Sequence, residues 1–302
     1  MSQAEWGRTG KMIEIATRIL EDSYPQTVRQ IYYRFVSLSE EEKDTIGGFP
    51  NNRLSLEKIS RLLRIAMESD RIPWEWIVDK SRPTYHGRGG YTRGPGEYLR
   101  EVLLSSNDYF RDYTVTQPNF IQVWLEKDAL SDTIVATTRP LGVDLVCARG
   151  FSSCSKSKEI AEELETVIDK PITIFYLGDH DPSGHCIEQA MARKVREYSD
   201  DVDFTIKRLA IHKADIARFH LPPQKIKSED SRAEGFREKF GEQCVELDAL
   251  PVEELRRRVH DAIWELIDEK EWNRAIEQES REGRVVERYM TKFRSLLPKK
   301  VS

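Results

Sequence analysis

The sequence predicts an α/β protein: a helical N-terminal domain, then a mostly parallel sheet flanked by helices, which continues into a helical C-terminal extension. Two patterns support this prediction. In roughly the first 70 residues, apolar side chains recur at the three- and four-residue spacing of helices. From about residue 120 onward, short apolar runs alternate with amphipathic segments. The length of 302 residues suits two modest domains.

Three helices are expected near the N-terminus. The first has an apolar face over Met12–Leu20 and is ended by Pro25. The second begins after Thr27, a suitable N-cap, and the third begins near Ser55. The segment EEEKDTIGGFPNN between them is expected to be a loop because of its glycines and proline. WEWIVD, which starts at Trp74, alternates in hydrophobicity and is expected to be a strand.

Three helices followed by a strand have the order of a helix-turn-helix domain with a wing. Residues 1–82 are therefore expected to form a winged-helix domain. Arg61 and Arg64 lie on its third helix, where they form either a DNA-binding face or an ordinary solvated helix face.

Residues 83–118 are expected to be a linker and a connecting helix. The stretch around their start, SRPTYHGRGGYTRGPG, is rich in glycine, proline and arginine. It is either a mobile connector or a functional loop in which Arg82 and Arg88 contact phosphates.

Residues 119–220 alternate between strands and helices. Strands are expected at IQVWL (121–125), LVC (145–147), ITIFYL (172–177) and VDFTIKRLA (202–210), and helices over 127–138, 156–168 and 182–198. This alternation predicts a mostly parallel sheet covered by helices. Residues 221–302 are expected to extend the same domain, with a short strand at CVEL (244–247) and helices between about 252 and 294.

The composition limits the class of protein. The formal net charge of −5 gives no attraction of the whole chain to nucleic acid, so any DNA contact must come from a local basic face. The four cysteines lack the spacing of a zinc site and are expected to be reduced thiols of the cytosol. No stretch has the apolar character of a signal peptide or a membrane span. A cytoplasmic, nucleoid-associated protein with no membrane partner is expected.

Two of the strong strands end in acidic residues. Glu126 follows one strand, and Asp179 and Asp181 follow the other. Parallel sheets bind ligands at the carboxyl ends of their strands, and residues two apart in extended backbone point the same way. If the strands are neighbours, three carboxylates gather there, and a hard cation such as Mg²⁺ or Mn²⁺ relieves their repulsion. Such a cation serves phosphoryl transfer. Alternatively, Asp181 simply caps the helix that begins at Pro182.

Taken together, WLEKDAL and YLGDHDPSGH resemble the two signature motifs of the Toprim domain, which is shared by topoisomerases, primases and certain nucleases. The resemblance implies a Toprim core over residues 119–220. It implies that Glu126 is a general acid/base or metal ligand and that Asp179 and Asp181 bind magnesium. Lys127, beside Glu126, is a candidate contact for a DNA phosphate.

A second motif narrows the resemblance. TVRQIYYRF (27–35) resembles the segment with the catalytic tyrosine in the A subunit of DNA topoisomerase VI and its meiotic double-strand-break relatives. In that family an arginine precedes the tyrosine by four positions, within a winged-helix domain that precedes a Toprim domain. Arg29 and Tyr33 have this spacing, so Tyr33 is the expected nucleophile and Tyr32 the alternative. Without catalysis, both would be ordinary core aromatics.

The resemblance implies Mg²⁺-dependent breakage and rejoining of double-stranded DNA by tyrosine transesterification, in a homodimer. It also implies an ATPase B-type subunit as partner, although this chain is shorter than the full-length A subunits and is more similar to compact bacterial and phage proteins. Two alternatives remain: a Toprim nuclease in which water attacks, and a DNA-binding protein without catalysis. A free tyrosine has a pKa near 10, so Tyr33 would need activation, which Arg29 could provide from one helical turn away.

Overall fold

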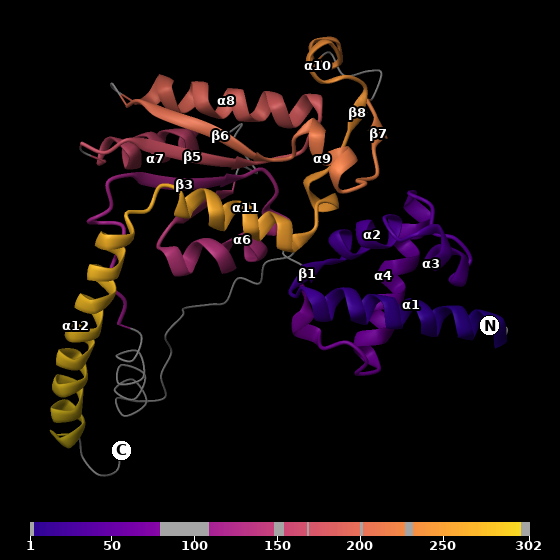
Figure 1. Ribbon diagram of the computed structural model, residues 1–302, viewed down its shortest axis with the longest axis horizontal. Helices are drawn as coiled ribbons and strands as arrows, with labels where there is room; N and C mark the ends of the chain where they lie inside the picture. The colour runs from indigo at the N-terminus through magenta and orange to yellow at the C-terminus, as the bar shows by residue number, and fades with distance from the viewer. Residues whose placement is uncertain are drawn as a thin grey trace. The chain divides into compact units, whose positions relative to one another are not determined.

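The structure, a computed structural model, describes residues 3–78, 109–147, 154–167, 169–199, 202–226 and 232–296 (Figure 1). These residues belong to two compact units. One unit takes the described residues of Met1–Ser81 and Phe120–Glu265, and the other takes those of Arg82–Asn119 and Leu266–Ser302. The segment expected as a single C-terminal extension is thus divided between the two units. Arg82 and Arg88 lie outside the described residues.

The first unit begins with helices connected by short segments. They are α1 (Gln3–Asp22), α2 (Val28–Val36), α3 (Glu40–Thr45) and α4 (Arg53–Glu68). The predicted start at Thr27 is confirmed: its hydroxyl accepts a hydrogen bond from the Gln30 amide, while the Gln30 side chain accepts one from the Thr27 amide. Asn52 caps α4 by accepting from the Ser55 amide, so α4 begins slightly earlier than expected.

Two local predictions are wrong. The expected loop after α2 contains α3, because Ser39 caps it and Glu40–Glu42 place negative charge at its N-terminus. The expected strand at Trp74 is instead a 3-10 turn, η1 (Trp74–Trp76), started by Pro73. Only β2 (Ile77–Val78) is extended, and it pairs in parallel with β1 (Gln26–Thr27).

A four-stranded parallel sheet lies at the centre of the unit. Its strands are β3 (Phe120–Leu125), β4 (Asp144–Cys147), β5 (Ile172–Leu177) and β6 (Phe204–Ala210), in the order β4-β3-β5-β6. All four predicted strands are confirmed, within a few residues at their ends. Strands β3 and β5 are neighbours, and Leu125 pairs with Leu177. The residues that follow these two strands therefore leave the sheet at the same edge.

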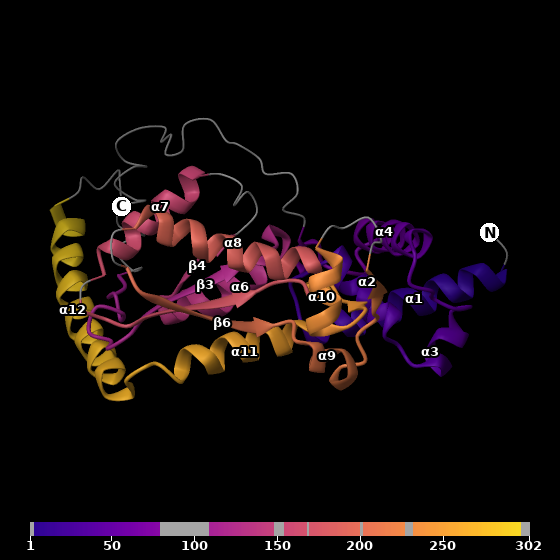
Figure 2. The ribbon, with the colours of Figure 1, turned by 90° about the horizontal axis from the view of Figure 1, so that it is seen from above.

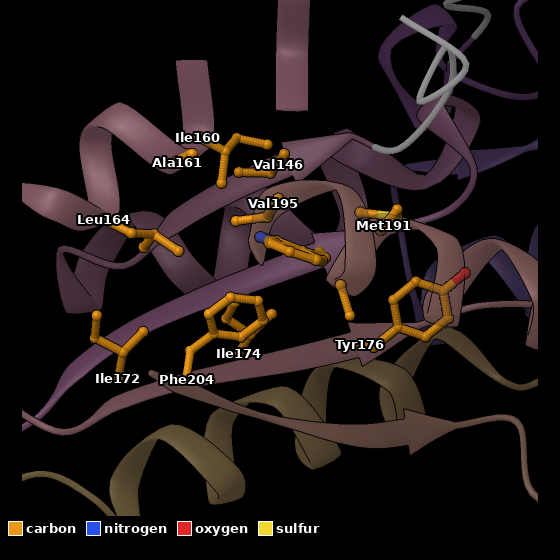
Figure 3. Packing of buried hydrophobic residues seen from close by; sticks show 12 residues of the cluster. Val146, Ile160, Ala161, Leu164, Ile172, Ile174, Tyr176, Met191, Val195 and Phe204 are labelled. Carbon is orange, nitrogen blue, oxygen red and sulfur yellow. The ribbon is translucent and has the colours of Figure 1, made fainter. Parts of the chain in front are cut away.

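Helices cover both faces of the sheet. Helices α7 (Cys154–Glu165) and α8 (Pro182–Tyr198) lie on one face, and α6 (Ser131–Thr138) and α11 (Val252–Trp264) lie on the other (Figures 1 and 2). The core between the sheet and the first pair is shown in Figure 3, where Ile174 and Tyr176 of β5 belong to one cluster of buried side chains with Ile160 of α7 and Val195 of α8. Fully burying a large apolar side chain contributes about 1.5–3 kcal/mol. The predicted α/β class, a parallel sheet flanked by helices, is confirmed.

After β6 the chain forms short elements around the sheet edge at which β3 and β5 end. They are α9 (Lys213–Arg218), β7 (Gln224–Lys225), α10 (Ala233–Phe240), β8 (Gln243–Cys244) and η5 (Leu247–Ala249). The predicted strand CVEL is too long, because only β8 pairs with β7. Val245 forms an isolated antiparallel bridge with His180 instead, and the Leu247 amide donates to Asp179 Oδ1 at 2.6 Å. Beyond Cys244 the chain therefore bonds to the residues that follow β5.

The second unit joins residues 109–119 to the long helix α12 (Glu269–Leu296). The Tyr109 hydroxyl donates to Glu282 Oε2 at 2.6 Å, and the rings of Tyr113 and Trp272 pack edge to face. Charged residues are spread along α12. Nowhere in the described ranges is a helix both long and apolar enough to cross a membrane.

Candidate active site

The carboxyl ends of β3 and β5 place three acidic residues at one sheet edge. The backbone amide of Asp179 donates to Glu126 Oε2 at 2.9 Å. Burial contributes most to the raised pKa values of Glu126 and Asp179, and charge adds to them: that of Asp181 at Glu126, and that of Glu126 at Asp179. The residues expected to gather here therefore interact electrostatically.

Two glycines make room for the Glu126 carboxylate. A Cβ atom at Gly178 would lie 2.6 Å from Glu126 Oε2, and one at Gly184 would lie 2.9 Å from the same oxygen and 2.5 Å from the Asp179 carbonyl oxygen. Tyr176 also packs here, and its hydroxyl is 3.4 Å from Glu126 Oε2. Reasoning from the sequence assigned no role to Tyr176 or these glycines, although the glycines flank the acidic pair in the motif GDHDPSG.

Burial and crowding disfavour the charged forms of these acids. Burial is the main cause that raises the pKa of Glu126, against the Asp179 amide hydrogen bond, which lowers it. Burial also raises the pKa of Asp179 to about 7, although the Lys127 charge opposes the shift. Positive charge at this edge would stabilise the ionised acids.

The two aspartates have different partners. Asp179 is held by the Leu247 amide and by Lys127, whose Nζ lies 3.1 Å from Asp179 Oδ1. Asp181 caps α8: its Oδ1 accepts from the Gly184 amide at 2.6 Å, and Pro182 occupies the first helical position. The helix-capping role considered for Asp181 is therefore present. This cap uses Oδ1 of Asp181, and none of the described residues donates a hydrogen bond to Oδ2.

The carboxylates at this edge are oxygen donors of the kind that Mg²⁺ prefers. No group of three or more His, Cys, Asp or Glu side chains in the described part of the chain is arranged to hold a metal. Mg²⁺, however, commonly binds one or two carboxylates and completes its coordination with water and phosphate oxygens. Glu126 and Asp181 each retain one carboxylate oxygen, Oε1 and Oδ2, that accepts no hydrogen bond from the described residues. These two residues, with Asp179 beside them, are the ones that could hold the ion.

Lys127 lies among a second set of carboxylates. Its Nζ is 3.1 Å from Asp179 Oδ1, 3.1 Å from Glu246 Oε2 and 2.8 Å from Asp248 Oδ2. Burial acts to lower the pKa of Lys127, but these three negative charges raise it far above its usual value. The lysine is thus a permanent positive charge beside the acidic edge.

Tyr33 lies at the other end of this cluster. Its side chain is buried, and its hydroxyl oxygen accepts a hydrogen bond of 3.1 Å from Gln224 Nε2. Burial, with the charge of Glu246, raises the pKa of Tyr33 to about 12, against the opposing effect of Arg29. The Tyr32 hydroxyl instead donates to Asn51 Oδ1 at 2.6 Å. Of the two tyrosines, Tyr33 is the one whose hydroxyl is influenced by Lys127.

Glu246 connects the tyrosine helix to the sheet edge. Arg29 Nη2 donates to Glu246 Oε1 at 2.7 Å, and Lys127 Nζ donates to Glu246 Oε2 at 3.1 Å. Burial acts to raise the pKa of Glu246, but Lys127 and Arg29 lower it overall, so the carboxylate is ionised near neutral pH. Glu246 lies 217 positions after Arg29, so the order of residues along the chain gives no sign of this contact.

Arg208 supports the backbone that carries the acids. Its Nη1 donates to the carbonyl oxygens of Gly178 and Asp179 at 3.0 and 3.1 Å, and its Nε pairs with Glu188 at 2.8 Å. The guanidinium lies over the ring of Tyr176, and the side chain is 8% exposed. Sequence reasoning missed Arg208; its place near the end of a predicted apolar strand was the available signal.

Two histidines beside the acids are neutral. His180 Nδ1 lies 3.2 Å from His185 Nε2, and both rings pack against Phe236 and Phe240 of α10. Burial lowers the pKa of His180 to about 4 and that of His185 to about 3. At neutral pH they add no positive charge to the site.

The remaining basic candidates lie elsewhere on the unit. Arg61 and Arg64 are exposed on α4, and Arg64 lies 3.8 Å from Glu68 of the same helix. Weak exposed pairs of this kind contribute little to stability. The structure thus places both arginines on the exposed face of α4.

Comparison of the chain with protein-family models, with curated proteins and with solved structures found no match in any of the three.

Proposed function

We propose that this protein breaks and rejoins DNA by a Mg²⁺-dependent tyrosine transesterification, in the manner of a topoisomerase VI A subunit. In this proposal residues 1–82 are a winged-helix domain and residues 119–220 are the core of a Toprim domain. The observation that carries the proposal is a series of contacts: Arg29, whose charge influences Tyr33, pairs with Glu246, and Glu246 pairs with Lys127, which also pairs with Asp179. Two motifs that are far apart in the sequence thereby meet in one compact unit.

The proposed reaction conserves the energy of the phosphodiester bond. The Tyr33 oxygen forms a bond to phosphorus and loses its proton to solvent, while the bond from phosphorus to the 3′ oxygen breaks and that oxygen takes a proton. The product is a 5′-phosphotyrosine and a free 3′ hydroxyl, and reversal reseals the strand. A homodimer would make one cut in each strand.

The chain's own residues supply positive charge and proton transfer. Arg29 and Lys127 are the proposed contacts for the phosphate oxygens. Glu126 has a raised pKa, which suits the acid that protonates the leaving 3′ oxygen. In that role Glu126 is protonated, so Asp179 and Asp181 would hold the Mg²⁺ ion, which would stabilise negative charge on the phosphate.

One observation favours hydrolysis as the second candidate. Tyr33 is buried and its pKa is raised to about 12, which makes it a poor nucleophile where it lies. In a nuclease, water would attack the phosphate and Tyr33 would only pack the core. Transesterification requires that the Tyr33 hydroxyl becomes accessible when DNA binds.

A plasmid-cleavage assay with Mg²⁺ or Mn²⁺, stopped with detergent, separates these candidates. We expect protein covalently attached to the 5′ ends of the cut DNA. Tyr33→Phe should abolish the attachment, whereas Tyr32→Phe, a matched change on the same helix, should retain it. Cut DNA with free ends would support the nuclease instead, and attachment that persists in Tyr33→Phe would refute the role of Tyr33.

A further inference from the structure

Two cations from distant parts of the sequence converge on one carboxylate. Arg29, on α2, donates to Oε1 of Glu246 at 2.7 Å, and Lys127, after β3, donates to Oε2 at 3.1 Å. An arginine and a lysine that bind the two oxygens of one anionic group form an anion-binding site. A phosphodiester offers the same feature, two anionic oxygens on one atom.

The site is accessible from solvent at one side. The Arg29 side chain is 50% exposed, whereas those of Lys127 and Glu246 are each 21% exposed. The buried hydroxyl of Tyr33 lies beside this site, since Arg29 and Glu246 both influence its pKa. An anion bound in place of the Glu246 carboxylate would therefore lie next to the proposed nucleophile.

The backbone around Glu246 is anchored to the sheet edge, whereas its carboxylate is held by the side chains of Arg29 and Lys127. Val245 exchanges two backbone hydrogen bonds with His180, at 2.9 and 3.0 Å, and the Leu247 amide donates to Asp179 Oδ1 at 2.6 Å. The carboxylate could therefore leave by rotation about its own side-chain bonds, without movement of η5 or the sheet edge.

We propose that Glu246 occupies the phosphate-binding position of Arg29 and Lys127 in the DNA-free protein, and that it is displaced when a DNA phosphodiester binds. Glu246 is then an internal competitor of the substrate. It holds the two cations in place, keeps a negative charge beside Tyr33 and weakens binding of DNA that does not displace it. The inference rests on the proposed function, because it takes the bound phosphodiester to be the one that Tyr33 attacks.

The test is DNA binding without chemistry. Binding of a fluorescein-labelled DNA duplex to the full chain is measured by fluorescence anisotropy in EDTA, for the wild type and Glu246→Gln. The glutamine keeps the size of the side chain but loses its charge, so we expect about tenfold tighter binding, since removal of an internal competitor raises the binding-competent fraction. Glu254→Gln is the matched control, because Glu254 also pairs with two basic residues, Arg257 and Arg258, and should leave binding unchanged.

Two further variants make the result decisive. Adding Arg29→Gln to Glu246→Gln should remove the gain, because the gain depends on the released guanidinium. If Glu246→Gln fails to fold, Glu246→Asp shortens the side chain by one methylene and should give a smaller gain in the same direction. A folded Glu246 variant that binds DNA no more tightly than the wild type would overturn the inference and leave Glu246 a structural ion-pair partner.

The two proposals can fail separately. Tighter binding by Glu246→Gln, in a protein that never forms a Tyr33-dependent covalent product with Mg²⁺, would support the internal competitor and refute transesterification. A wild type that forms this product, with no gain in binding for Glu246→Gln, would refute the internal competitor alone.

Discussion

The backbone amide of Asp179 donates a hydrogen bond of 2.9 Å to Oε2 of Glu126. This bond joins the carboxyl ends of β3 and β5 and fixes one oxygen of the acid that the proposed reaction uses. The same oxygen has the two glycine positions, Gly178 and Gly184, as close neighbours. The geometry of the site therefore depends on these glycines as well as on the acids.

Gly184→Ala should displace the Glu126 carboxylate. The new Cβ would meet Glu126 Oε2 at 2.9 Å and the Asp179 carbonyl oxygen at 2.5 Å, and the carbonyl belongs to backbone that cannot easily move. We expect a stability loss of about 1–3 kcal/mol and a loss of about 100-fold in cleavage rate from misplaced groups. Urea unfolding and the plasmid assay measure the two effects.

Gly235→Ala is the control for that experiment. Gly235 lies in α10, and a Cβ there would have nothing within 4 Å. We expect cleavage to be unchanged and stability to rise by up to about 1 kcal/mol, as for a helical glycine replaced by alanine. Equal losses in both variants would mean that the crowding at Gly184 has no special effect.

Glu126→Gln should lower the rate of cleavage without lowering the stability of the fold. The change removes a buried charge that is disfavoured by burial and by Asp181, so the metal-free protein should unfold no more easily than the wild type. Cleavage should fall by about 100-fold or more, because the variant loses a proton-transfer group. A variant that retains cleavage would remove Glu126 from the mechanism.

The paired histidines predict sensitivity to acid. His180 and His185 have folded-state pKa values lowered to about 4 and 3, against an ordinary value of 6.5. Between pH 6.5 and 4 these two histidines bind protons in the unfolded chain but not in the folded one, so their contribution to stability is present above pH 6.5 and is lost as the pH falls. The slope should reach up to about 1.4 kcal/mol per pH unit for each histidine. Urea titrations across this range should show a shallower slope for His185→Gln, and an unchanged slope would contradict the assignment.

Arg208→Lys should weaken the support of the backbone that carries the acids. Lysine has no planar guanidinium, so it cannot donate to the carbonyl oxygens of Gly178 and Asp179 while it also pairs with Glu188. We expect a stability loss of about 3 kcal/mol, typical of a broken buried ion pair, and slower cleavage. Arg257→Lys is the control: Arg257 is half-exposed and pairs with Glu254 and Asp261 of the same helix, so this change should leave stability almost unchanged. Similar losses in both variants would show that Arg208 has no particular role.

Local patterns in the sequence determined much of the fold. Apolar runs located β3, β5 and β6, and the capping residue Thr27 located the start of α2. These features depend on neighbours a few residues away, which the sequence displays directly. Where local signals competed, as at α3 and at Trp74, the sequence predicted the wrong element.

The sequence by itself determined the α/β class and the acidic residues that end the two central strands, because strand ends and residue types are local properties. Only the tertiary structure decided which groups these acids meet. It placed Lys127 among Asp179, Glu246 and Asp248, and it brought Arg29 to Glu246 across 217 positions of sequence. Such contacts arise from the packing of distant elements. Their Coulomb energies and pKa shifts depend on distance in space and on burial, and the order of residues along the chain gives neither quantity.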